Sequence, residues 1–136
     1  MVKTLNLRAD RQDLDILLEN LEEILEKGDC PKDKKTGIML SAEELFVNVA
    51  DYAYGDKAGY CNIDIECDKK GIVIKMADGG EKFDPLAHKD PDLTLSASDR
   101  QIGGLGILMA KRYMDSIDYI YDNERSENRI TLKKMW

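Results

Sequence analysis

The sequence has few residues that could build a zinc site or a disulfide framework. Its 136 residues include one histidine, His88, and three cysteines, Cys30, Cys61 and Cys67. Because the cysteine count is odd and the spacing fits neither a disulfide framework nor a zinc ligand pair, we expect reduced thiols. Cys61 and Cys67 are an even number of positions apart in a strand-like segment, so they should share a face and pack as small hydrophobic side chains.

The chain also lacks a basic excess and any long apolar run. Its 27 acidic and 20 basic residues give a net charge of -7, which is a poor match for nucleic acid or an anionic membrane surface. No segment approaches the roughly 18 apolar residues of a membrane-spanning helix, and the first residues have no signal-peptide character. We therefore expect a cytoplasmic protein with one domain, residues 1–136, and an acidic surface that could receive a basic protein.

Two hydrophobic periodicities divide the chain into helices and strands. Alternation of apolar and polar residues predicts strands, and three- to four-residue spacing predicts helices. Strands and helices in this order favour a two-layer α/β (α+β) sandwich, with a mainly antiparallel sheet and the helices on one face. The predicted strands are 3–8, 60–67, 72–78, 116–121 and 129–134; the predicted helices are about 10–28, 31–54 and 103–115; and 79–102 is a long loop.

The second predicted helix carries a carboxylate and a carboxamide four residues apart. Glu44 and Asn48 therefore lie on one face of that helix. Asn48 offers a neutral oxygen that suits Mg²⁺, and Glu44 could act as a general base or hold a metal-bound water. Taken alone, the pair is more often just two polar residues at the solvent edge of a helix.

Two further segments suit a nucleotide. Asp78 ends an apolar strand, and a buried carboxylate there would accept from the exocyclic amine of adenine, while Gly80 would let a flat base approach the backbone. The cluster Gly103-Gly104-Leu105-Gly106 opens the third helix, where free N–H groups and the helix dipole suit phosphate. It is neither a P-loop nor a dinucleotide fingerprint, and an Asp-Gly turn or a glycine-rich helix start is weak evidence alone.

The ordered combination of these segments resembles the Bergerat-fold, histidine kinase-like ATPase superfamily of DNA gyrase, Hsp90 and the histidine kinases. Within it, the chain most resembles the anti-sigma factor serine/threonine kinases. The likeness extends over essentially the whole chain, and it departs at Tyr52, where relatives often carry histidine. Its motifs are E-x-x-x-N at Glu44 and Asn48, D-x-G-x-x-F-D-P at Asp78, Gly80, Phe83, Asp84 and Pro85, and G-G-L-G-I at Gly103, Gly104, Leu105, Gly106 and Ile107.

The resemblance implies a domain that binds ATP or ADP with Mg²⁺. Glu44 would be the catalytic base, Asn48 the metal ligand and Asp78 the adenine anchor. The loop of about 79–102 would act as the ATP lid, and the segment from about Ser96 to Gly106 would cover the phosphates. The implied partners are a sigma factor and a small antagonist protein phosphorylated on serine, and, since members of the family are often homodimers, a second copy of the chain. The alternative is a non-catalytic module that binds nucleotide as a structural ligand and only sequesters a protein partner.

Overall fold

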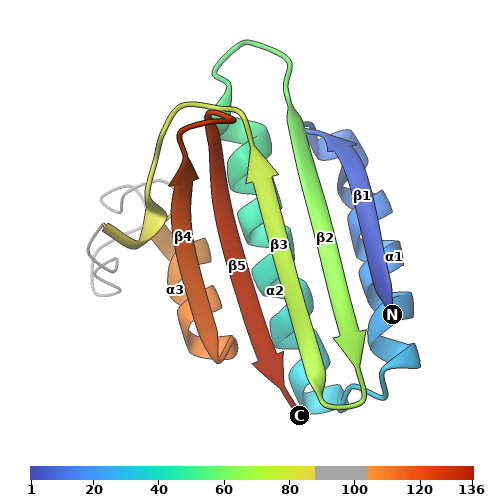
Figure 1. Cartoon of the computed structure of the whole chain (residues 1–136). Coiled ribbons are helices and arrows are strands. Elements are labelled where there is room, and N and C mark those ends of the chain that lie inside the picture. The colour runs from blue at the N-terminus through green and yellow to red at the C-terminus, as the bar shows by residue number, and fades with distance from the viewer. Residues whose placement is uncertain (88–103) are drawn as a thin grey trace.

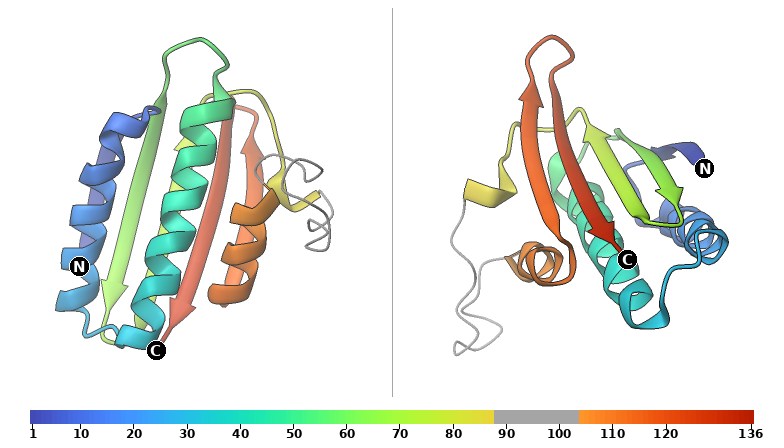
Figure 2. Two further views of the ribbon diagram at one scale, coloured as in Figure 1. Left: turned by 180° about the vertical axis from the view of Figure 1, so that it is seen from behind. Right: turned by 60° about the horizontal axis from the view of Figure 1, so that its bottom comes forward.

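A five-stranded sheet is the framework of the molecule, and three helices cover one of its faces (Figure 1). The computed structural model describes residues 1–87 and 104–136. Both views in Figure 2 show α1, α2 and α3 on the same side of the sheet. The elements in chain order are β1 (Val2–Arg8), η1 (Arg11–Asp13), α1 (Leu14–Lys27), α2 (Lys32–Asn48), η2 (Val49–Ala53), β2 (Tyr60–Asp68), β3 (Gly71–Asp78), η3 (Pro85–Ala87), α3 (Gly104–Tyr113), β4 (Ser116–Asp122) and β5 (Glu127–Met135).

The strands lie in the order β1-β2-β3-β5-β4. All four neighbouring pairs are antiparallel, so no parallel pair occurs in the sheet as the structure describes it. The two-layer sandwich with helices on one face, expected from the sequence, is confirmed. In this order the last strand, β5, lies beside the central strand β3.

Strict alternation along β3 decides which side chains enter the core. Ile72, Ile74 and Met76 are buried, and Lys75 between them is exposed on the open face. Asp78 continues the buried series, so its carboxylate lies on the helix-covered side. The alternation therefore places the Asp78 carboxyl group at the edge of the apolar core. That core also includes Leu17, Leu21, Leu25, Ile38, Ala42, Leu45, Phe46, Ile63, Ile65 and Leu132.

The helix boundaries follow the expected signals, with one refinement at the end of α2. The Asp10 carboxylate accepts a hydrogen bond from Gln12 N at 2.8 Å, and the chain makes a short 3₁₀ turn before α1 begins. The second helical stretch does run to the region of Tyr54, as predicted. Its last part, Val49–Ala53, widens into a π-helical turn directly after Asn48.

The cysteines and the last residue, Trp136, lie where they contribute to packing. All three cysteines are free thiols, and Cys61 and Cys67 are both buried on the inner face as expected. Trp136 packs against the core, and its indole Nε1 donates to Gly28 O at 3.2 Å. Within the described ranges, no helix has the length and apolar character needed to cross a bilayer.

Candidate functional site

The end of α2 and the start of α3 bring three of the predicted site residues together. Glu44 and Asn48 stand one turn apart in the last part of α2, and both are half-buried. Gly106, in the first turn of α3, lies against both side chains. A Cβ on Gly106 would lie 3.0 Å from Glu44 Cβ and 3.3 Å from Asn48 Nδ2. The glycine therefore permits an approach of the two helices that almost any side chain would obstruct.

This close approach places the amino end of α3 beside the polar edge of α2. The first N–H groups of a helix have no partner within the helix and carry the positive end of its dipole. An anion held there would lie next to the side chains of Glu44 and Asn48. A carboxylate, a neutral carboxamide and a helix amino end thus meet at one place, although Glu44 and Gly106 are far apart in the sequence.

Asp78 forms the second part of the site. Its side chain is only 8% exposed, and its Oδ1 accepts from Gly80 N at 3.0 Å and from Asn128 Nδ2 at 3.1 Å. Burial raises the pKa of this carboxyl, and the negative charge of Glu127 raises it further. The hydrogen bonds from Asn128 and Gly80 act in the opposite direction and lower the pKa. No donor among the described residues reaches the other oxygen, Oδ2. Asp78 therefore keeps one acceptor oxygen available for a ligand.

The backbone after Asp78 packs against the π-helical turn that follows Asn48. Ala53 O accepts from Glu81 N at 2.9 Å. A Cβ on Gly80 would lie 2.3 Å from the same oxygen, which is closer than any real contact. Gly80 is therefore required here by close backbone approach, and the contact brings the Asp78 end of β3 to the Asn48 end of α2. Figure 1 shows both at the same end of the molecule.

A tyrosine pair fixes the backbone beside Asp78. Tyr54 Oη donates to Tyr60 O at 2.5 Å and accepts from Gly79 N at 2.7 Å. Tyr60 Oη in turn donates to Glu127 Oε2 at 2.6 Å, and this hydrogen bond holds the pKa of Glu127 below its usual range. Burial, with the hydrogen bond to Glu127, raises the pKa of the Tyr60 hydroxyl. The turn at Gly79 is thus connected to β2 and β5.

The donor set fits magnesium held mainly by a nucleotide rather than by the protein. Among residues 1–87 and 104–136, no group of three or more His, Cys, Asp or Glu side chains could hold a metal ion. Mg²⁺ usually takes only one or two protein ligands and fills its shell with phosphate oxygens and water. A single carboxamide at Asn48, beside the helix amino end that would face the phosphates, matches that pattern.

Some predicted site residues cannot be placed. Gly103, Ser96 and His88 lie outside the described residues, and so does most of the predicted loop. Gly104 begins α3, as the glycine cluster predicted, and Leu105 follows it in the same helix.

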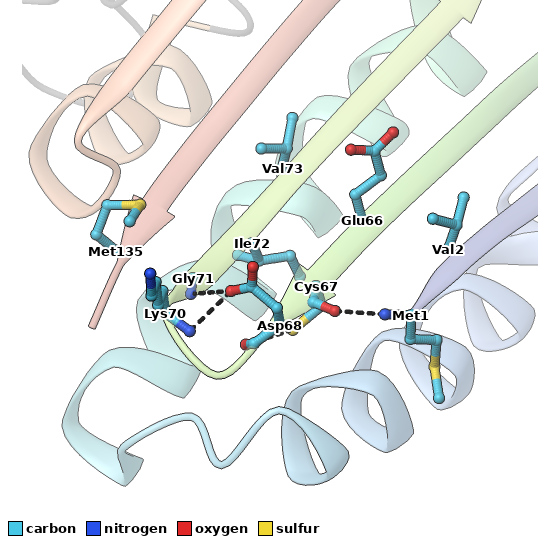
Figure 3. A pocket seen from close by; sticks show the side chains of 10 residues that line it. All are labelled: Met1, Val2, Glu66, Cys67, Asp68, Lys70, Gly71, Ile72, Val73 and Met135. Atoms are coloured by element: carbon cyan, nitrogen blue, oxygen red, sulfur yellow. Dashed lines mark hydrogen bonds between the residues drawn. The ribbon is translucent and has the colours of Figure 1, made fainter.

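A pocket of about 330 Å³ lies at the opposite end of the sheet (Figure 3). It is lined by residues from β1, β2, β3 and β5, including Val2, Val73 and Met135. Its carboxylate at Asp68 is engaged in the β2–β3 turn, where Oδ1 accepts from Lys70 N and Gly71 N. None of the predicted site residues lines this pocket, so we place the functional site at the Asp78 end.

Sequence reasoning missed the residues that hold Asp78 in place. Asn128 lies directly opposite Asp78 in the pairing of β3 with β5. Tyr54, Tyr60 and Glu127 complete the surroundings. The only hint in the sequence was a polar pair, Glu127 and Asn128, at the start of an alternating strand. This pair indicates a role at the site only once that strand is known to lie beside β3.

Comparison with known proteins agrees with this fold and identifies a family. Residues 7–134 match the family described as the histidine kinase-like ATPase domain. Over 84 residues the chain is 26% identical to the serine/threonine-protein kinase BtrW of Bordetella bronchiseptica; the match covers 60% of this chain and 58% of that protein, so the chain spans little more than half of that relative. The fold is similar to a chain in the crystal structure of the RsbU and RsbW domains of Rv1364c from Mycobacterium tuberculosis, with a TM-score of 0.69 at 12% identity, covering 99% of this chain and 32% of that one.

Proposed function

The chain belongs to the histidine kinase-like ATPase domain family, and from that premise we propose that it is an ATP-dependent protein serine/threonine kinase. The observation that carries the proposal is the contact of Gly106 with Glu44 and Asn48. This contact brings a carboxylate, a carboxamide and a helix amino end to one place, which supports their proposed roles as base, metal ligand and phosphate-binding segment. The similarity to a protein named as a serine/threonine kinase supports the same reading.

Each site residue has a distinct role in the proposed reaction. Asp78 Oδ2 accepts a hydrogen bond from the adenine amine, and the backbone N–H groups at the start of α3 receive phosphate oxygens. Asn48 holds Mg²⁺ through its side-chain oxygen. The metal ion, when bound, neutralises charge on the phosphate oxygens. Gly103, Gly104, Leu105 and Gly106 would form the phosphate-binding segment, together with a lid in the region of 79–102.

Glu44 is the proposed general base. A serine hydroxyl is a weak nucleophile at neutral pH, so a carboxylate that accepts its proton accelerates attack on the phosphate, typically by about a hundredfold or more. Glu44 can serve the same phosphate as Asn48 because both residues face Gly106. The serine oxygen then forms the new bond to phosphorus, ADP leaves with its terminal oxygen, and the proton resides on Glu44.

The partners are proposed from the family resemblance. We propose that the chain sequesters a sigma factor and phosphorylates a small antagonist protein, that it acts in the cytoplasm, and that it can associate as a homodimer. Light scattering at micromolar concentration that showed only monomer would remove the dimer from this account.

The decisive experiment compares Glu44→Gln with Glu43→Gln, its neighbour in α2. Each variant is incubated with labelled ATP, Mg²⁺ and the candidate antagonist encoded nearby. The Glu44→Gln variant should bind ATP like the wild type but lose at least about a hundredfold in transfer, because an amide cannot accept the proton. The Glu43→Gln variant should retain transfer.

Two results would change the assignment. Wild-type transfer by Glu44→Gln would show that Glu44 is not the base. A wild type that binds both ATP and the antagonist but never phosphorylates it would favour the binding-module alternative.

A further inference from the structure

The side chain of Asn128 makes five hydrogen bonds that fix the orientation of its amide. Its Nδ2 donates to Asp78 Oδ1 at 3.1 Å, to Glu81 O at 2.8 Å and, at the longer distance of 3.5 Å, to Gly80 O. Its Oδ1 accepts from Phe83 N at 3.0 Å and from Tyr119 Oη at 2.5 Å. A carbonyl can only accept and a backbone N–H can only donate, so the amide fits in one direction only. Asn128 is 7% exposed, and its hydrogen bond to Asp78 is buried.

The fixed amide of Asn128 makes the two oxygens of Asp78 differ in their hydrogen bonding. Its Oδ1 receives two donors, Gly80 N and Asn128 Nδ2, while no donor in the described part of the chain reaches Oδ2. A donor that a ligand brings to Oδ2 therefore forms a hydrogen bond to a charged group in a mostly buried setting, where such a bond is strong. The two oxygens of a carboxylate are chemically equivalent, and only their surroundings assign one to the protein and the other to a ligand.

We propose that Asn128 is a positioning residue that makes this assignment and thereby fixes which side-chain group of residue 78 meets the amino group at C6 of a purine. Asn128 holds Asp78 Oδ1 in place from the neighbouring strand, so the group at the Oδ2 position is the one that meets the base. The proposal rests on the proposed function, since it takes Asp78 as the adenine anchor. It goes further by naming the residue that determines which atom of Asp78 faces the base.

The alternative is that Asn128 only stabilises the chain around Glu81 and Phe83. Loss of a purely stabilising residue lowers the affinity for all nucleotides alike, whereas loss of a positioning residue changes the ratio of the affinities for two nucleotides. The test therefore measures a ratio, the affinity for ATP relative to inosine triphosphate, ITP. ITP carries an oxygen at C6 in place of the amine and lacks the additional 2-amino group of GTP.

The first variant is Asp78→Asn. Gly80 N and Asn128 Nδ2 still require an acceptor at the Oδ1 position, so the new amide must keep its oxygen there and turn its NH₂ to the Oδ2 position. That position then carries a donor, which matches the C6 oxygen of ITP. The wild type should prefer ATP, and Asp78→Asn should prefer ITP, each by roughly tenfold, about the effect of one buried hydrogen bond.

The second step removes Asn128 from the Asp78→Asn protein. In Asp78→Asn/Asn128→Ala the amide is free to turn, so the preference for ITP should fall to within about threefold of equality. Asn128→Asp in the same background should also abolish the preference. It keeps the shape of the side chain but replaces the donor with an acceptor, and it remains informative if the alanine variant does not fold. Tyr119→Phe is the matched control: it removes a hydrogen bond to Asn128 Oδ1 but leaves Nδ2, so the ITP preference should persist.

The outcomes separate this inference from the proposed function. A folded wild type that binds neither ATP nor ADP overturns the nucleotide site and this inference together. Suppose that the wild type prefers ATP, but that the preference of Asp78→Asn for ITP persists when Asn128 is also replaced by Ala or by Asp. The proposed function then stands, and the role of Asn128 is overturned. Loss of the preference in the double variants, with its retention in the Tyr119→Phe control, supports the positioning role.

Discussion

Burial of Asp78 disfavours the ionised form of its carboxyl group. Burial raises its pKa above the ordinary value of 3.8, despite the hydrogen bonds from Asn128 and Gly80. A folded state with the higher pKa holds the proton more tightly than the unfolded chain. Asp78 therefore contributes stability below the unfolded pKa, and this contribution is lost as the pH rises through the folded pKa.

Asp78→Asn should remove this pH-dependent loss in the nucleotide-free protein. The difference in unfolding free energy, variant minus wild type, should rise from acid pH and level off above the folded pKa of Asp78, because the amide cannot ionise. Urea denaturation across the acid range measures it, with the exposed Asp64→Asn on β2 as the control. A difference that stays flat with pH would mean that Asp78 titrates alike in the folded and unfolded chains.

Asn48→Ala tests the metal ligand separately from the base. ADP should bind roughly ten- to a hundredfold more weakly in the presence of Mg²⁺, while binding in EDTA should change little, because only the metal-dependent part of the affinity is removed. Titration calorimetry with and without Mg²⁺ measures both quantities. Asn62→Ala on β2, outside the site, is the control. If Asn48→Ala gained as much affinity from Mg²⁺ as the wild type, Asn48 would not be the ligand.

At the scale of single residues, the sequence could predict Glu44, Asn48 and Asp78 as candidate site residues because each pattern is local to one element, α2 for the first two and β3 for Asp78. It did not identify Asn128. That residue acquires its role only from pairing across the sheet, opposite a residue from a distant part of the chain. A local pattern cannot encode a register that tertiary packing decides.

At the scale of elements, the contact between α2 and α3 creates the site at one end and only packs the helices at the other. Gly106 touches Glu44 and Asn48, whereas Gly37 lies against the ring of Tyr113, where a Cβ would come within 2.8 Å of Cγ. The sequence predicted both helices and the glycine-rich start of α3. The π-helical turn after Asn48, which brings Ala53 O to Glu81, had no recognisable signal in the sequence.

Gly106→Ala and Gly37→Ala form a matched pair, since each adds one methyl group between the same two helices. Gly106→Ala should weaken ADP·Mg²⁺ binding roughly tenfold by crowding Glu44 and Asn48. Its stability should fall less than that of Gly37→Ala, because alanine favours the helix by up to about 1 kcal/mol at both positions but the added Cβ is less crowded at Gly106, where its nearest atom lies at 3.0 Å against 2.8 Å at Gly37. Gly37→Ala should lower the melting temperature but keep the wild-type affinity.

Thermal melts and calorimetry on both glycine variants measure these effects. Equal loss of nucleotide affinity in the two would mean that general helix packing, and not the contact with Glu44 and Asn48, supports binding.

At the scale of the whole molecule, the alternation of β1, β2 and β3 and the apolar stripes of the helices were sufficient to predict a two-layer sandwich. They were insufficient to predict that β5 and not β4 lies beside β3. Either strand of the last hairpin reads as an alternating strand of suitable length, so both arrangements satisfy the pattern. The arrangement adopted is the one that brings Asn128 to Asp78 and Glu127 to Tyr60.

The central claim is a nucleotide site at the Asp78 end of the sheet that reads adenine, and titration calorimetry with ADP·Mg²⁺ and GDP·Mg²⁺ tests it most directly. The account predicts saturable binding of ADP at one site per chain and at least tenfold weaker binding of GDP. ADP at a hundred times its dissociation constant should also raise the melting temperature by on the order of 10 °C. Equal affinity for the two nucleotides, or no binding of ADP by the folded protein, would contradict it.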